Sequence, residues 1–108
     1  MLNNVIKLKI EEENYEISIN IGKMINCERI SGKSFIPLVQ EAEQGSILAL
    51  SQILSECLSK DGKSVGIDFI SGLDFDVFDE LIQPLIGAIN NSFPDSSKKK
   101  VEILTPIK

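Results

Sequence analysis

The fold is decided by residues 5–21, VIKLKIEEENYEISINI, in which apolar and polar side chains alternate at nearly every position. A period of two is typical of half-buried strands, so this stretch predicts two strands. Glu12, Glu13 and Asn14 interrupt the alternation, and asparagine tolerates a left-handed backbone. We therefore expect an antiparallel β-hairpin that turns at residues 12–14. A two-stranded hairpin is marginal alone, so its apolar face must pack against the rest of the chain.

After the hairpin, apolar residues recur at a spacing of three and four, which is typical of amphipathic helices. The pattern predicts a short helix over residues 22–30, closed by Gly32. A second helix is expected to run from a Ser34 cap to Gly45. A third helix is expected over residues 46–60.

The strongest apolar stripe comes last in the chain. Its members are Phe78, Leu81, Ile82, Leu85, Ile86, Ile89 and Phe93. Asp74 or Asp76 offers its N-cap, and we expect this to be the central core helix. Pro84 removes one helical hydrogen bond, which predicts a kink or a break near Gln83. Residues 64–72 fit neither period and are expected to form a loop with at most a short helical turn.

These elements predict an α+β fold, mainly α, in which an N-terminal antiparallel hairpin packs on a small bundle of three to four helices. Residues 1–97 are expected to form a single domain. Residues 98–108 are basic and are expected to form a flexible tail, although Val101, Ile103 and Leu104 could add an edge strand.

Composition narrows the class of protein. The 108 residues are 43% hydrophobic and 25% charged, which is ordinary for one globular domain. The net charge of −5 opposes attraction to nucleic-acid phosphates and anionic membranes, so neither partner is expected. No apolar run approaches the roughly 20 residues of a membrane span, and no secretion signal is visible. We therefore expect a cytoplasmic protein.

Side chains with catalytic or metal-binding chemistry are few. The chain contains no histidine, and its two cysteines, Cys27 and Cys57, are far apart in the sequence. Both lie among apolar residues at helical spacing, so we expect buried thiols, with a disulfide as the minor alternative. The glutamates at residues 11–13 fall in the expected turn, where nothing would separate their pKa values. We expect no enzyme activity, no metal and no cofactor.

Two motifs have ordinary structural explanations. Gly32-Lys33-Ser34 matches the end of a phosphate-binding loop, but Cys27 stands where that loop requires its first glycine. A helix stop followed by a cap explains the same residues. An acidic run comprises Asp68, Asp74, Asp76, Asp79 and Glu80. It lacks the spacing of a calcium loop and is typical of a helix first turn, where the dipole favours negative charge.

The order of these elements resembles the small tail assembly chaperones of long-tailed bacteriophages and prophages. The resemblance covers about residues 5–93. Its components are the hairpin, the short helix through Ile21-Gly22-Lys23-Met24, the helix at residues 35–43, the helix start Gly45-Ser46-Ile47-Leu48-Ala49-Leu50 that runs on to Leu58, and the acidic-capped helix at residues 78–93. No catalytic motif is involved.

The resemblance implies a protein of the host cytoplasm that binds the tape measure protein and delivers it to the tail tube protein. Self-association into a homo-oligomer is expected on separate grounds, because a domain of this size buries a modest share of its surface and can gain stability from a further copy. Members of the family are often made in two lengths through a ribosomal frameshift, and Lys98-Lys99-Lys100 is the kind of tract that a run of adenines encodes.

Such a chaperone needs apolar surface that it can lend to a client. The candidate partner-binding residues are Phe35, Ile36, Leu38, Phe78, Leu81, Leu85 and Phe93. The alternative for each is a place in the core. Two other classes of protein remain open, namely a structural tail subunit such as a terminator or connector, and a small bacterial adaptor.

Overall fold

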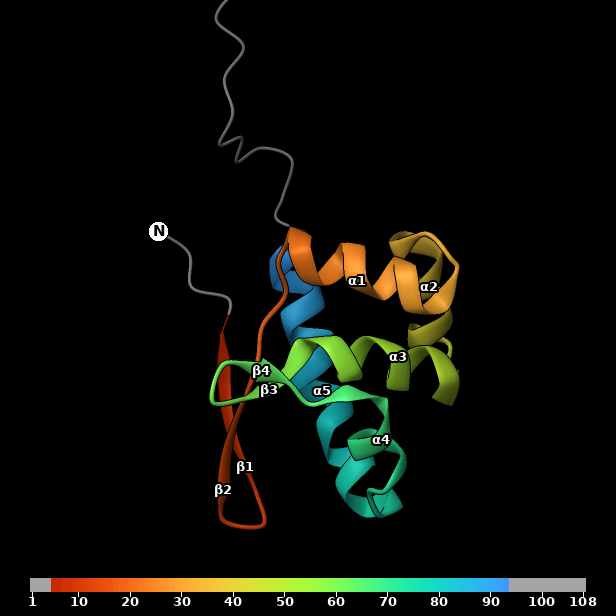
Figure 1. Cartoon of the computed structure of the whole chain (residues 1–108). Helices are drawn as coiled ribbons and strands as arrows, with labels where there is room; N and C mark the ends of the chain where they lie inside the picture. The colour runs from red at the N-terminus through yellow and green to blue at the C-terminus, as the bar shows by residue number, and fades with distance from the viewer. Residues whose placement is uncertain (1–4, 94–108) are drawn as a thin grey trace, which may run out of the picture.

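The computed structural model describes residues 5–93, and the expected tail at residues 98–108 lies outside this range. The described residues form an antiparallel sheet and five helices, so the predicted α+β, mainly α class is confirmed. Figure 1 shows the helices gathered beside the sheet, with the N-terminal hairpin at one side of the molecule.

The sheet has four strands in the order β1-β2-β3-β4, and every neighbouring pair is antiparallel. The strands are β1 (Ile6–Ile10), β2 (Glu13–Ile17), β3 (Leu58–Lys60) and β4 (Lys63–Ser64). The first two form the predicted hairpin, whereas β3 and β4 form a second hairpin that the apolar pattern did not predict.

The first turn lies at Glu11 and Glu12, so the prediction of a turn at residues 12–14 is wrong. Both glutamates have left-handed backbones, with φ of 50° and 72°, and Asn14 already belongs to β2. A two-residue turn with positive φ matches the twist of a hairpin, which favours this tighter connection. The resulting register pairs Leu8 with Tyr15 and leaves Tyr15 on the buried face.

The five helices are α1 (Ile21–Ser31), α2 (Phe35–Glu43), α3 (Ile47–Cys57), α4 (Gly66–Ser71) and α5 (Phe75–Ser92). Helices α1 and α2 agree with the predicted segments to within one or two residues. Helix α4 is the short helical turn expected within residues 64–72. Helix α5 starts after Asp74 and continues unbroken through Pro84, so the helix does not break there.

The connection from α1 to α2 is fixed by specific caps. Asn20 accepts a hydrogen bond from the Lys23 backbone N–H, and Gly32 closes α1 with a left-handed φ of 71°. Ser34 precedes α2 but its side chain makes no cap bond. Instead, the Glu28 carboxylate accepts a hydrogen bond of 2.8 Å from the Phe35 backbone N–H. An acid from α1 thereby satisfies one of the free donors at the start of α2.

Helix α3 ends at Cys57, three residues before the predicted end, because the next residues pair with β2. Asp61 and Gly62 then form a two-residue turn with φ of 54° and 82°. They join two strands rather than stopping a helix.

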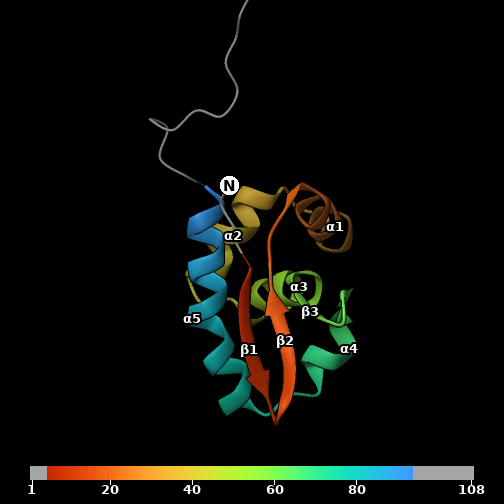
Figure 2. The same cartoon turned by 90° about the vertical axis from the view of Figure 1, so that its left-hand side faces the viewer.

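Helix α3 occupies the centre of the molecule, a place that the sequence predicted for the last helix. It packs against α1, α2 and α4 and also contacts β2, β3 and β4. Helix α5 lies beside β1 and β2. Figure 2 shows β1 and β2 in front of α3, with α5 next to β1 and α4 on the opposite side.

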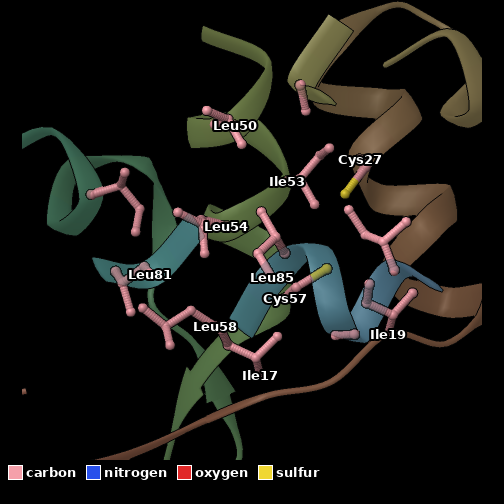
Figure 3. Packing of buried hydrophobic residues seen from close by; sticks show 14 of the residues in the cluster. Ile17, Ile19, Cys27, Leu50, Ile53, Leu54, Cys57, Leu58, Leu81 and Leu85 are labelled. Atoms are coloured by element: carbon pink, nitrogen blue, oxygen red, sulfur yellow. The ribbon is translucent and has the colours of Figure 1, made fainter. Parts of the chain in front are cut away.

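One apolar core joins the five helices and strands β1, β2 and β3. Its most deeply buried large side chains are Ile17, Leu38, Ile53, Leu54, Leu58, Leu85 and Ile89. Figure 3 shows Leu85 of α5 among Leu54, Cys57 and Leu58. Cys27 and Cys57 are both free and fully buried, as predicted.

Candidate functional site

The structure divides the seven candidate partner-binding residues into two groups. Five are buried in the core, namely Phe35, Leu38, Phe78, Leu81 and Leu85. Their apolar stripes face the other elements, so they cannot contact a partner in this conformation. Ile36 and Phe93 remain exposed, at 50% and 43% for the whole residue, and the centre of the Phe93 ring lies 6.3 Å from that of the Phe35 ring.

A different apolar surface lies where three helices meet. Ile30 in the last turn of α1, Leu48 in the first turn of α3 and Ile67 in α4 are all exposed. They line a hollow of about 230 Å³ whose remaining walls are Gln52, Ser55 and Glu56 of α3. We call this feature the apolar hollow.

Its position follows from the packing of α3 against α1 and α4. These contacts bury Ile53 and Leu54 on the inward face of α3 and leave Leu48 uncovered at its beginning. Leu48, which belongs to α3 itself, is 62% exposed. In the sequence, the three-and-four spacing of this helix joins Ile47, Leu50, Ile53, Leu54, Cys57 and Leu58, and Leu48 lies outside that stripe.

The polar wall of the apolar hollow could orient a bound side chain. The Ser55 hydroxyl donates a hydrogen bond of 2.7 Å to the Gln52 carbonyl, so its own proton is already engaged. The Gln52 side chain and the Glu56 carboxylate are the remaining polar groups. An apolar floor with a polar wall on one side suits a side chain from an amphipathic segment.

A larger depression, of about 580 Å³, lies over the sheet. Its charged lining residues include Lys7, Lys9, Glu16 and Asp61. Lys7 is directly opposite Glu16 in the sheet register. Because charges of both signs alternate there, the depression does not concentrate one charge for binding an anion or a cation.

One ion pair ties the two hairpins together. The Glu13 carboxylate lies 2.7 Å from the Lys60 ammonium group, which also lies 5.7 Å from the centre of the Tyr15 ring. The hydrogen bond and charge of Lys60 lower the pKa of Glu13 below its ordinary value. The same contact raises the pKa of Lys60. Because both groups are exposed and paired with each other, we assign this ion pair to holding the two hairpins together and not to binding a ligand.

The buried thiol of Cys57 is not an activated nucleophile. Two main causes raise the pKa of the Cys57 thiol far above its ordinary value: the larger is a hydrogen bond with Cys27, and the smaller is burial. A thiol must lose its proton to attack or to bind a metal, so this environment suppresses both reactions.

The two sequence motifs agree only in part with the roles predicted for them. Gly32-Lys33-Ser34 joins two helices, but Ser34 makes no cap bond, and of the acidic run only Asp68 and Asp76 lie in the first turn of a helix. Gly32 is the C-cap of α1, and the Lys33 ammonium group lies 2.7 Å from the Glu41 carboxylate. Among the described residues, no group of three or more histidine, cysteine, aspartate or glutamate side chains is arranged to hold a metal ion.

Comparisons with known proteins return no family model, no curated protein and no solved structure that matches this chain. Within residues 5–93, none of the helices combines the length and the apolar character that crossing a membrane requires.

Proposed function

We propose that this chain is a tail assembly chaperone of a long-tailed bacteriophage or prophage. It would bind the tape measure protein in the host cytoplasm and assist its assembly with the tail tube. The observation that carries the proposal is the apolar hollow of Ile30, Leu48 and Ile67. The resemblance in element order supplies the identity of the client.

The size of the apolar hollow favours a protein client over a small molecule. Its volume of about 230 Å³ is below the roughly 300 to 1,000 Å³ of typical small-molecule pockets. One bulky apolar side chain of a client helix could insert beside Leu48, with the next turn lying over Ile30 or Ile67. This is the helix-in-groove mode, in which apolar residues recur every three or four positions.

Charge supports the choice of segment within the client. Glu56 borders the apolar hollow, and the chain carries a net charge of −5. A client helix with a lysine or arginine beside its apolar residues would match both features. We therefore expect the bound segment to be amphipathic and basic.

The test is co-expression with the tape measure protein from the same gene cluster, followed by size-exclusion chromatography with light scattering. The proposal predicts that the client becomes soluble and co-elutes with this chain. An insoluble client, together with a closed ring formed by this chain alone, would instead support a structural tail subunit. Self-association as such is compatible with the chaperone, so recovery of soluble client decides between the two.

A further inference from the structure

Strand β1 forms one edge of the sheet, since β2 is its only neighbour in the strand order of the described residues. The Ser18 backbone N–H, just after β2, donates a hydrogen bond to the Cys57 carbonyl. The even-numbered residues of β2 therefore direct their backbone groups toward β3, and the odd-numbered ones toward β1. Tyr15 then pairs with Leu8 of β1, as the register requires. The backbone N–H and C=O groups of Lys7 and Lys9 consequently point to the open edge.

A groove runs along this edge. It has a volume of about 220 Å³ and lies between β1 and the first half of α5. Its apolar lining residues are Leu8, Ile10, Val77, Leu81 and Pro84, and the charged residues Lys9, Glu11 and Glu80 also line it. Figure 2 shows α5 standing next to β1 along this side of the sheet. An added strand would therefore find backbone partners on one side and an apolar surface beneath it.

The charges along β1 indicate which side chains an added strand would carry on its outer face. Lys7 and Lys9 are exposed and lie on the sheet face away from the helices, while Leu8 faces inward. Lys7 has Glu16 as its cross-strand neighbour, but Lys9 is opposite the uncharged Asn14. An acidic residue on an incoming strand would complement Lys9, since opposite charges on neighbouring strands stabilise a sheet.

We propose that the open edge of β1 binds an extended segment of a partner protein as a fifth strand, and that this segment alternates apolar with acidic residues. Its apolar side chains lie in the groove against Val77 and Pro84. Its acidic side chains lie beside Lys7 and Lys9 on the outer face. This site is separate from the apolar hollow and does not depend on the identity of the client there.

A second copy of the chain is a poor occupant of this edge. Antiparallel pairing of β1 with β1 of another copy would place Lys7 beside Lys9 on the outer face. Like charges on adjacent strands destabilise the pairing, and edge lysines are a common means of preventing it.

The experiment titrates the full-length, ¹⁵N-labelled chain with two synthetic heptapeptides, one alternating valine with glutamate and the other alternating valine with lysine. We expect the acidic peptide to bind about tenfold more tightly, because opposite rather than like charges flank Lys7 and Lys9. Chemical shifts of the Lys7 and Lys9 amides should change, and their hydrogen exchange should slow.

Three variants make the test specific. Lys9→Glu should reverse the preference between the two peptides. Lys9→Pro removes an outward backbone donor and should weaken binding of the acidic peptide by about tenfold, while the spectrum confirms that the sheet persists. Lys63→Glu changes an exposed lysine on the distant strand β4 and should leave the preference unchanged.

Four results would overturn the proposal. One is equal affinity for both peptides, and a second is absence of binding by either. A third is a molecular mass that rises with concentration in the native chain but not in Lys9→Pro, since a second copy would then occupy the edge. The fourth is binding that occurs only after residues 98–108 are removed, since the chain's own C-terminal segment would then be the occupant.

Discussion

Glu11 and Glu12 are the residues whose backbone conformation is least suited to their side chains. Both adopt positive φ in the first hairpin turn, where a residue with a Cβ atom is strained. The second hairpin solves the same problem with Asp61 and Gly62, which favour this turn. The first turn is therefore a place where stability can be gained without touching the core.

Replacing the pair by Glu11→Asn and Glu12→Gly should stabilise the fold by about 1 to 2 kcal/mol, because Asn-Gly adopts a two-residue turn with little strain. Chemical denaturation measures the change in the free energy of unfolding. Asn14→Gly provides the matched control, because it introduces glycine inside β2 and should destabilise the protein. A first-turn variant less stable than the native chain would contradict this account of the strain.

Glu13 should make stability depend on pH at both extremes. Lys60 lowers its pKa below the ordinary 4.5, so the ion pair stabilises the fold above that pH and is lost as Glu13 becomes protonated below it. The pKa of Lys60 is raised above 10.5, so the contribution is also lost as pH rises past that value. Unfolding of the native chain and of Glu13→Gln should differ between these limits and converge outside them. A constant difference down to low pH would show that the pair contributes nothing.

At the scale of the elements, periodicity located most of the secondary structure but not its connections. The alternation in residues 5–21 predicted the first hairpin, and the apolar stripes predicted α1, α2, α3 and α5. Strands β3 and β4 are three and two residues long, which is too short for an alternating pattern to show. Asp61-Gly62 was the available signal, since this dipeptide favours a hairpin as strongly as it favours a helix stop.

The apolar stripe of α5 predicts that this helix contributes strongly to the free energy of unfolding. Leu85→Ala should destabilise the protein by about 2 to 5 kcal/mol, because Leu85 is fully buried and its truncation leaves a cavity. Ile36→Ala, at a half-exposed position in α2, should cost less than about 1 kcal/mol. Thermal or chemical unfolding of both variants measures the contrast. Equal losses would mean that α5 does not close the core.

At the scale of the whole molecule, the candidate site was less predictable than the fold. Periodicity identifies the apolar face of each helix but does not show which apolar residues stay uncovered once the helices pack. Five of the seven predicted partner-binding residues lie in the core for this reason. The apolar hollow instead combines Ile30, Leu48 and Ile67 from three helices, and only their packing brings them together.

The whole-molecule account depends on the apolar hollow being a binding surface rather than an incidental gap between helices. Leu48 and Ile21 allow a matched comparison, since each lies in the first turn of its helix and they are 62% and 68% exposed. Leu48 lines the apolar hollow, whereas Ile21 lies at the end of α1 away from Ile30. A glutamate in a helix first turn is favoured by the helix dipole, so both substitutions should leave the fold intact.

The most direct measurement is the amount of soluble tape measure protein recovered when it is co-expressed with the native chain, with Leu48→Glu or with Ile21→Glu. A charge placed in the apolar hollow would have to be desolvated on binding, so Leu48→Glu should lower recovery by about tenfold or more. Ile21→Glu should recover as much client as the native chain. Full recovery with Leu48→Glu, while Ile21→Glu abolishes it, would contradict the claim that the client binds in the apolar hollow.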